Sequence, residues 1–469
     1  MSTSAQPTRD GIPLKVIMVS VVAALGGLLF GFDSSVINGA VDAIQDRWNL
    51  SGAITGFVVS VALIGAMVGA WFAGSIADRF GRIRAMLLAA TLFAVSSVGS
   101  AFCFDIIDLS IWRAVGGVGV GMASVIAPAY IAEIAPARVR GRLGSLQQLA
   151  IVTGIFLALL SDAFIANTAG GAAQPVWLGL EAWRWMFLVE VVPAVLYGVL
   201  ALMVPESPRY LVAKGDLARA KLVLRDVVGL RTEEAVEHKI EDIERTSNAE
   251  ARQSLRDLKG PAWGLMPVVW IGIALSVFQQ FVGINVIFYY STTLWRSVGF
   301  SESDSFTVSV ITSVTNIVVT IVAIALVDKV GRRPMLLVGS AGMAVALGVM
   351  ALAFSQSVMV DGAVSLPGAW GMVALVAANA FVVAFGATWG PVVWVLLGEM
   401  FPNRVRAIAL SVAAAAQWLA NFLVTTTFPT LSEIGLTLAY GIYAFFALLS
   451  LWFVARYVKE TKGKELEDM

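Results

Sequence analysis

Two stretches, GSIADRFGRIRAMLL at residues 74–88 and IALVDKVGRRPMLL at residues 324–337, decide how this chain is organised. Each places an acidic residue, a glycine and a cluster of basic residues between long apolar runs. A second pair of motifs follows the same plan, with EIAPARVR at 133–140 and EMFPNRVR at 399–406. Within each pair the spacing is roughly 250–270 residues, which is too long for a stacked short repeat and indicates two related halves.

The composition is that of a membrane protein. Residues of the AVILMFWYC set make up 58% of the 469 residues, and charged residues make up only 14%. A soluble globular chain has about 45–50% apolar and about 25% charged residues. The apolar runs are long enough to cross a bilayer as helices, which takes about 20 residues each. Twelve spans are predicted, at approximately 15–40, 55–77, 84–104, 108–130, 145–165, 183–204, 264–292, 304–328, 334–356, 369–398, 405–429 and 434–457.

The spans fall into six before and six after a charged central segment. This segment contains LARAKLVLRDVV at 217–228 and AVEHKIEDIER at 235–245, whose charges have helical spacing. The predicted fold class is therefore an all-α membrane protein of twelve transmembrane helices in two six-helix halves, with a cytoplasmic helical linker. The predicted boundaries are 1–204 for the N-terminal bundle, 205–262 for the linker, and 263–469 for the C-terminal bundle with a short tail.

Basic residues mark one side of the predicted membrane. Loops on that side contain Arg79, Arg82, Arg84, Arg138, Arg140, Arg142, Lys329, Arg332, Arg333, Arg404 and Arg406. The intervening loops carry mainly acidic charges. An excess of Lys and Arg in short loops marks the cytoplasmic side. We therefore expect a multi-pass protein of the inner (plasma) membrane, with both termini and the linker in the cytoplasm.

Several function classes are excluded by what the chain lacks. The formal net charge is zero, which gives no electrostatic reason to bind nucleic acid. Cys103 and His238 are the only cysteine and histidine, which excludes an internal disulfide and the usual thiolate or imidazole metal sites. The central segment contains no glycine-rich phosphate loop and no nucleophile–base pair. We expect no cofactor, no metal and no enzymatic activity.

Asp33 is an acidic residue inside the first predicted span, directly after GGLLFGF. A carboxylate at that depth is costly and is by default a functional hypothesis with a partner to be found. The predicted partner is Arg113, near the start of the fourth span. A buried pair is weak evidence for stability, but it works as a switch if motion separates the two and lets Asp33 take up a proton. The alternative is that Asp33 lies near the outer interface and is simply hydrated.

The second half carries amides and aromatic residues where the first half has an acid. Gln279, Gln280 and Asn285 lie in QQFVGINVIFYY, and Gly283 between them favours an interrupted helix. The tenth span is predicted to bend at Pro391, because a proline inside a helix frees backbone groups. The other polar and aromatic candidates in the spans are Asn316, Trp394, Gln417, Trp418, Asn421 and, in the first half, Gln148.

Together these side chains suit a neutral polyol. Amides both donate and accept hydrogen bonds, so they fit hydroxyl groups, and an indole stacks on the C–H face of a sugar ring. A carboxylate or phosphate substrate requires more buried cations than Arg113 alone. The other interpretation of any single amide is that it joins neighbouring helices. In a membrane protein of paired halves, we expect the site at their interface, with access from alternate sides.

A series of motifs in order extends over essentially the whole chain. They are GGLLFGFD at 26–33, ADRFGR at 77–82, GGVGVG at 116–121, PAYIAEIAPARVRG at 128–141, PESPRYL at 205–211, QQFVGINVIFYY at 279–290, DKVGRR at 328–333, WGPVVWVLLGEMFP at 389–402 and AAQWLANF at 415–422. Through them the chain resembles the sugar porter family of the major facilitator superfamily. Within that family it most resembles the bacterial proton-coupled glucose and xylose symporters.

The resemblance implies roles for individual residues. Asp33 matches the proton-coupling carboxylate and Arg113 its partner, whereas the eukaryotic facilitators carry a neutral Asn at the position of Asp33. The residues that match sugar-contacting positions are Gln148, Gln279, Gln280, Asn285, Asn316, Trp394 and Gln417, with Trp418 and Asn421 close by. The residues that match an inner-face charge network, which pairs the halves when the inside is shut, are Asp78, Arg82, Glu133, Arg138, Arg140, Asp328, Arg332, Arg333, Glu399, Arg404 and Arg406.

The resemblance implies secondary active uptake of a neutral monosaccharide by proton symport. Ile155 stands where some xylose symporters carry a second glutamine, which favours D-glucose. A uniporter in which Asp33 is only structural stays open, as do xylose, galactose or inositol as the sugar. A sensor or a membrane enzyme has less support, since neither a long tail nor a catalytic motif is present. The expected partners are the sugar, the proton and the lipid bilayer, and we expect a monomer.

Overall fold

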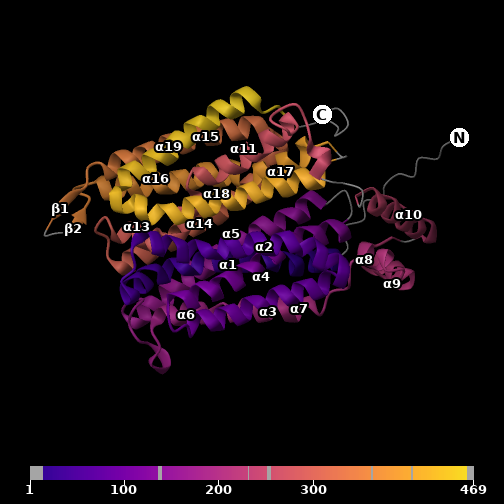
Figure 1. The fold of residues 1–469 in the computed structure, drawn as a ribbon, viewed down its shortest axis with the longest axis horizontal. Coiled ribbons are helices and arrows are strands. Elements are labelled where there is room, and N and C mark those ends of the chain that lie inside the picture. Colours follow the sequence, from indigo (N-terminus) through magenta and orange to yellow (C-terminus); the bar gives the residue numbers. More distant parts are fainter. Residues whose placement is uncertain are drawn as a thin grey trace.

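The twelve spans predicted from the sequence are confirmed. The structure, a computed structural model, describes residues 14–135, 140–230, 232–250, 255–360, 363–402 and 405–461. Within this part, twelve helical segments are long and apolar enough to cross a membrane. Their axes run side by side, and the N-terminal half, in indigo to magenta, lies next to the C-terminal half, in orange to yellow (Figure 1).

The N-terminal half contributes the first six spans. They are α1 (Leu14–Trp48), α2 (Gly52–Phe80), α3 (Arg82–Ala101), α4 (Ile106–Ile134), α5 (Arg140–Ala169) and the pair α6 (Ala182–Val189) and α7 (Val191–Ala201). The sixth span is broken at Glu190, three residues before Pro193. Because proline has no backbone N–H, the helix loses a hydrogen bond at this turn.

The linker is helical, as the charge spacing predicts. It contains α8 (Pro208–Ala213), α9 (Leu217–Val223), the π-turn η3 (Leu224–Val228), α10 (Glu233–Glu250) and the short η4 (Leu255–Leu258). Lys221 of α9 pairs with Glu233 and Glu237 of α10 at 2.8 and 3.2 Å. These short helices lie beyond one end of the bundle (Figure 1).

The C-terminal half contributes the other six spans. They are formed by α11 (Pro267–Phe281), α12 (Ile284–Tyr289), α13 (Ser291–Arg296), α14 (Glu302–Val330), α15 (Arg332–Phe354), α16 (Trp370–Ala384), the π-turn η5 (Phe385–Trp389), α17 (Gly390–Met400), α18 (Arg406–Ile434) and α19 (Leu436–Tyr457). The seventh span is interrupted where predicted, because Gly283 has a left-handed φ of +81° between α11 and α12. The tenth is irregular at η5, just before Pro391.

The prediction of an all-α chain misses a small two-stranded sheet. Strands β1 (Val358–Val360) and β2 (Ala363–Ser365) pair antiparallel, with Met359 opposite Val364. The sequence VMVDGAVS places β-branched residues on both sides of Asp-Gly, which is a strong short-range signal for a hairpin. The hairpin connects α15 to α16 outside the spans, so the helical architecture is otherwise as predicted.

Two names for the ends of the bundle are used below. The hairpin end is the end that carries β1 and β2, and the linker end is the end that carries α8 to α10 (Figure 1). Between these ends the halves pack through α2 against α18 and α5 against α14. The first contact is close enough to require a glycine, because a Cβ on Gly56 would lie 2.1 Å from the carbonyl oxygen of Thr426.

Candidate functional site

The structure brings Asp33 and Arg113 together inside the N-terminal half. Asp33 lies in α1 and Arg113 in α4, and Arg113 Nη1 is 3.1 Å from Asp33 Oδ1. Their side chains are only 8% and 3% exposed, respectively. The guanidinium also lies over the Phe187 ring, 5.9 Å from its centroid. Asp33 is therefore buried rather than hydrated, and removing Arg113 would leave an uncompensated charge.

Two further buried acids lie near this pair, and neither was predicted as a site residue. Glu190, at the break between α6 and α7, is 2% exposed and accepts a hydrogen bond from Ser97 Oγ at 2.9 Å. It interacts electrostatically with Asp33 and Arg113. Asp162 of α5 is completely buried and interacts with Glu190. In the sequence, each of them is an acidic residue within an apolar span, which is the feature that also identifies Asp33 as a candidate.

Amides of the C-terminal half form a connected set around the irregular turn η5. Gln279 Nε2 donates to the backbone carbonyls of Trp389 and Gly390, at 3.0 and 3.2 Å. Gln417 Nε2 donates to Gln279 Oε1 at 2.6 Å. Gln279 therefore ties α11 to the backbone at the junction of η5 and α17. Gln417 Oε1 is buried without a partner, which makes it an acceptor for a ligand hydroxyl.

A second amide pair lies across the break in the seventh span. Asn285 Nδ2 donates to Gln280 Oε1 at 2.6 Å, which the interruption between α11 and α12 allows. Asn421 of α18 is 4% exposed and accepts from Thr425 Oγ1 at 3.1 Å. Asn316 of α14 is 7% exposed. Gln279, Gln280, Asn316 and Asn421 are thus buried, whereas Asn285, Gln417 and Gln148 are partly buried.

Residues of both halves line one cavity next to the buried pair. Its lining includes Phe30, Asp33, Ser34 and Arg113 from the N-terminal half and Tyr289 and Trp418 from the C-terminal half, and the other five lining residues are aliphatic. Its volume of about 10 Å³ has room for about one water molecule, so a sugar fits only when the halves move apart. The Phe30 and Trp418 rings lie 5.5 Å apart. Tyr289 interacts with both Ser34 and Asn421. Tyr289, which was not predicted as a site residue, therefore connects the ionisable pair of one half to the amides of the other.

Of the nine residues predicted to bind sugar, only Trp418 lines this cavity, whereas the seven amides and Trp394 are not part of its lining. Trp394 of α17 is 42% exposed, and Gln148 of α5 is partly buried. Trp389 is the fully buried tryptophan of this region, and its Nε1 donates to Leu336 O at 3.1 Å and to Ser340 Oγ at 3.0 Å. It anchors η5 against α15. Sugar contacts by Trp394 and Gln148 stay a prediction.

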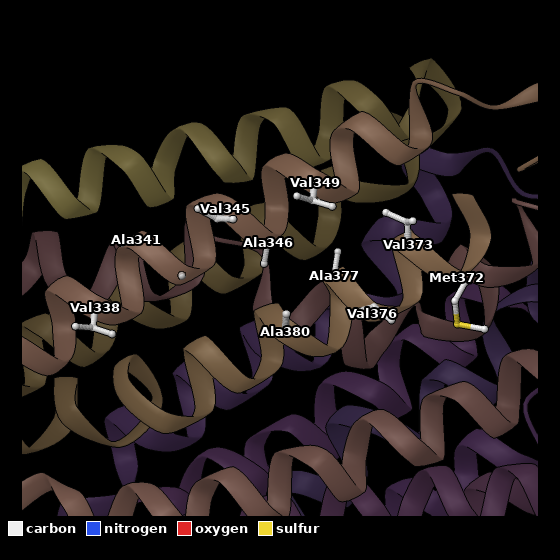
Figure 2. A pocket seen from close by; sticks show the side chains of 11 residues that line it. Val338, Ala341, Val345, Ala346, Val349, Met372, Val373, Val376, Ala377 and Ala380 are labelled. Carbon is white, nitrogen blue, oxygen red and sulfur yellow. The ribbon is translucent and has the colours of Figure 1, made fainter. Parts of the chain in front are cut away.

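A larger groove of about 740 Å³ lies between α15 and α16 (Figure 2). Its lining consists of small and aliphatic residues, namely Val338, Ala341, Gly342, Val345, Ala346, Val349, Met372, Val373, Val376, Ala377 and Ala380. Hydroxyl groups placed against such a lining would lose their hydrogen bonds to water without replacement. Size alone therefore does not identify the sugar site, and the smaller cavity between the halves, which contains the buried ion pair, is the better candidate once the halves move apart.

Arg82 lies in a cluster of acids at the linker end. Its guanidinium is 2.8 Å from Glu133 and 3.1 Å from Asp78. The side chains of Arg82 and Glu133 are each 9% exposed, whereas that of Asp78 is 72% exposed. Glu206 Oε1 accepts a hydrogen bond at 2.9 Å from the backbone N–H of Arg82, the first residue of α3. These bonds join α2, α3, α4 and the chain after α7.

The C-terminal half repeats this cluster. Arg332 Nη2 is 2.7 Å from Glu399 Oε1, and Glu460 Oε1 accepts from the backbone N–H of Arg332 at 3.0 Å. Thr461 Oγ1 donates to Glu399 at 2.6 Å. Glu206 and Glu460 were not predicted as members of the network. In the sequence, Glu206 and Glu460 lie in two similar motifs, PESP at 205–208 and KETK at 459–462. Each motif follows the last span of its half, and this similarity indicates equivalent roles.

The remaining members of the predicted network are only partly described. Arg333 donates from its backbone N–H to Glu460 Oε2 at 3.0 Å and from Nη2 to Ala455 O at 2.8 Å. Arg138 and Arg404 lie outside the described residues, as do the side chains of Arg140, Asp328 and Arg406. The Arg82–Glu133 and Arg332–Glu399 pairs each join helices of one half. Pairing between the halves through this network therefore stays a prediction.

Comparison with known proteins accounts for this arrangement. The model of the family described as Sugar (and other) transporter matches residues 19–469. The chain belongs to this sugar transporter family. A glucose transport protein of Synechocystis sp. is 56% identical over 472 residues, which cover 100% of both chains. A D-xylose-proton symporter of Escherichia coli K12 is 37% identical, with 97% of this chain and 95% of that protein covered.

Solved structures show the same fold. The partially occluded inward-open conformation of the xylose transporter XylE from E. coli matches with a TM-score of 0.82 at 36% identity, covering 96% of this chain and 100% of that one. XylE bound to 6-bromo-6-deoxy-D-glucose matches with a TM-score of 0.79 at 37% identity, covering 97% and 98%. The family member described here is therefore a multi-pass membrane protein with the major facilitator fold, as predicted.

Proposed function

We propose that this protein takes up a neutral monosaccharide, D-glucose in particular, together with a proton by alternating access. The observation that carries the proposal is the cavity in which the Asp33–Arg113 pair lies next to Tyr289 and Trp418. The titratable pair of one half and two aromatic side chains of the other half border the same small space there, between the halves. Each ligand is therefore placed to bias the same movement, which is the condition for coupling.

Asp33 is the proposed proton-binding residue. Arg113 lies 3.1 Å from Asp33 and compensates the charge of its carboxylate while the pair is formed. Protonation removes that charge and releases Arg113, so the cavity changes shape and charge together. Relatives named as xylose-proton and arabinose-proton symporters support this assignment.

The amides and aromatic rings of the C-terminal half are the proposed sugar-binding groups. Gln417 offers an unpartnered acceptor, and Trp418 presents an aromatic ring to the cavity. A relative named as a glucose transport protein at 56% identity supports D-glucose as the substrate. Gln148, Gln279, Gln280, Asn285, Asn316, Trp394 and Asn421 complete the proposed sugar-binding set.

The orientation in the membrane is part of the proposal. The basic ends of α2, α3 and α14, with Arg79, Arg82 and Lys329, lie at the linker end, so this end is assigned to the cytoplasm of the inner membrane. Both termini then lie in the cytoplasm, because α1 begins and α19 ends there. We assign the two six-helix halves as the moving units and the 205–262 segment as the cytoplasmic connection between them. The functional form is proposed to be a single copy, which transports without a catalytic step.

The test is transport by the full chain in proteoliposomes. An inward proton gradient is expected to drive accumulation of labelled D-glucose, and sugar addition is expected to make an unbuffered outside medium more alkaline. Asp33→Asn is expected to abolish accumulation while sugar counterflow continues, because the neutral amide still fits but carries no titratable proton. The exposed linker substitution Asp226→Asn is the matched control and is expected to behave as wild type.

Two outcomes contradict the proposal. If Asp33→Asn still concentrates glucose, Asp33 is not the coupling group, and a uniporter or a different proton site replaces it. If unlabelled xylose, galactose or inositol displaces the label in counterflow better than glucose does, the substrate assignment is wrong while the transport mechanism stands.

A further inference from the structure

Asp162 is a buried carboxyl group that the proposed transport cycle does not yet use. It lies in α5, seven residues before Ala169 at the hairpin end of that helix, with 0% exposure. Among the described residues, neither of its carboxyl oxygens has a hydrogen-bond partner of good geometry, although the backbone of Gly39 is close enough to interact with it. The nearest backbone is that of Gly39 in α1, where an added Cβ would lie 2.8 Å from Asp162 Oδ2 and 2.8 Å from Met186 Sδ. Only a glycine leaves room for this carboxyl group.

Asp162 continues a series of buried ionisable groups. It interacts with Glu190, and Glu190 interacts with Asp33 and Arg113. Glu190 Oε1 also lacks a partner, although Oε2 accepts from Ser97. Gly39, which marks the depth of Asp162, lies six residues after Asp33 in one continuous helix, or about 9 Å nearer the hairpin end. The series therefore runs from the hairpin end toward the cavity.

The charges of this cluster do not balance if all of its acids are ionised. Three carboxyl groups face one guanidinium, from α1, α5, the α6–α7 break and α4. The next charged groups toward the hairpin end are already paired, as Asp42 is with Arg296 and Glu181 is with Arg184. An unpaired carboxylate without hydrogen bonds in a membrane interior is strongly unfavourable. Neutrality therefore requires two protons on the three carboxyl groups.

We propose that Asp162 is a second proton-binding site, which takes up protons from the hairpin end and passes them through Glu190 to Asp33. The proposal rests on the proton symport assigned above. In the resting state Asp33 pairs with Arg113, while Glu190 and Asp162 each carry a proton. Transfer of the Glu190 proton to Asp33 frees Arg113, which then pairs with the new Glu190 carboxylate.

The cycle conserves protons. When Asp33 releases its proton toward the linker end, Arg113 returns to Asp33. Glu190 then takes the proton of Asp162, and Asp162 takes a new one from water at the hairpin end. One proton enters and one leaves for each turn, and the cluster never holds more than one uncompensated charge. Asp162 thus holds a proton that is available to Glu190, and this supply has its largest effect when the outside pH is high.

The test compares Asp162→Asn with wild type and Asp162→Glu in proteoliposomes at a series of outside pH values. Asn has the same shape as a protonated Asp but cannot release the proton. Asp162→Asn is expected to keep sugar counterflow, to accumulate sugar at acidic outside pH, and to lose accumulation at an outside pH of about 8, where direct protonation from water is slow. Asp162→Glu is expected to restore accumulation there.

Infrared spectroscopy of the wild type gives a second measurement that does not depend on the folding of a variant. A C=O band of a buried protonated carboxylic acid is expected at neutral pH, and its absence overturns the proposal. Wild-type accumulation by Asp162→Asn at every pH also overturns it and makes Asp162 a packing residue, with proton symport intact. If the wild type itself neither accumulates sugar nor moves protons, the symport proposal is wrong and this one falls with it.

Discussion

The two ends of the bundle are held together in different ways. At the hairpin end, bonds run between the halves. Asp42 of α1 accepts hydrogen bonds from Thr293 Oγ1 at 2.6 Å and Arg296 Nη1 at 2.7 Å, both on α13. Asn38 O accepts from Thr292 Oγ1 at 2.7 Å. At the linker end, by contrast, the pairs centred on Arg82 and Arg332 run within a half.

The difference indicates which bonds must break during transport and which must last. Bonds between the halves at the hairpin end have to open for a sugar to enter from that side. Clusters within a half, such as Arg82 with Glu133, are able to stay formed while the halves move as rigid bodies. The linker-end clusters therefore maintain the shape of each half, and the hairpin-end bonds set the balance between conformations.

The largest expected effect is on a linker-end cluster. Glu133→Ala removes the closest and most buried carboxylate from the Arg82 guanidinium and leaves it near Asp78, which is exposed, and Glu206, which bonds its backbone N–H. Removing one partner of a buried pair costs about 3–5 kcal/mol. The melting temperature in detergent and the transport rate are both expected to fall sharply. Glu399→Ala is expected to cost less, because Glu399 is 27% exposed. Equal stability of Glu133→Ala and wild type would contradict a structural role for this cluster.

The second effect concerns Cys103, the lone cysteine, which lies at the hairpin end between α3 and α4. Burial raises the pKa of its thiol to about 11, two units above the ordinary value of 9.0. Only the thiolate reacts, so alkylation by a maleimide at neutral pH is expected to be about 100-fold slower than in the unfolded protein, and to speed up as pH rises. Labelling at the unfolded rate would show that this end is open.

The third effect is on the balance between conformations. Arg296→Ala removes an ion pair that is partly exposed, at 40% and 18%, and such a pair contributes about 1 kcal/mol, or about a fivefold change in populations. Electron–electron distances between spin labels on Phe104→Cys and Gln356→Cys, in a Cys103→Ser background, are expected to shift toward a wider hairpin end.

The exposed arginine of the linker, Arg245, provides the control for this experiment. Its side chain is 80% exposed and pairs with Asp242 of its own helix. Arg245→Ala is expected to leave the distance distribution unchanged. If Arg296→Ala has the same distribution as Arg245→Ala, the ion pair with Asp42 does not hold the hairpin end closed.

The smallest effect tests the symmetry of the linker end. Glu206 and Glu460 each accept hydrogen bonds from the first backbone N–H groups of a helix, α3 and α15 respectively. Glu206→Gln and Glu460→Gln are each expected to lower the free energy of unfolding by about 1 kcal/mol, through loss of a charged group at a helix N-terminus. The double substitution is expected to be additive, and strong non-additivity would mean that the two clusters communicate.

Much of the fold follows from the sequence because it depends on features that a span carries by itself. Length and hydropathy predict twelve spans, the glycine at 283 predicts the break in the seventh, and Pro391 marks the irregular tenth. The hairpin at 358–365 was missed because the membrane pattern on both sides dominated the interpretation. It is a local feature, and its Asp-Gly signal was readable.

The candidate site was less predictable, because it depends on which faces of the helices meet. Asp33 and Arg113 were predictable as a pair, since few charges lie at that depth. Glu190 and Asp162 carry the same signal but were passed over as parts of ordinary spans. That Tyr289 lines the cavity while Trp394 does not is decided by the rotation of α12 and α17, which no residue pattern of one helix reveals.

The break at Gly283 gives the seventh span a fixed bend. A side chain there would meet the ring of Tyr443 at 2.7 Å, and the left-handed φ disfavours any other residue, so the helix does not straighten during transport. Beyond this bend, α12 and α13 form a short helical segment. Its near part presents Tyr289 to the cavity, and its far part presents Arg296 to Asp42. A sugar that touches Tyr289 is therefore connected through this segment to the bond between Arg296 and Asp42, which closes the hairpin end.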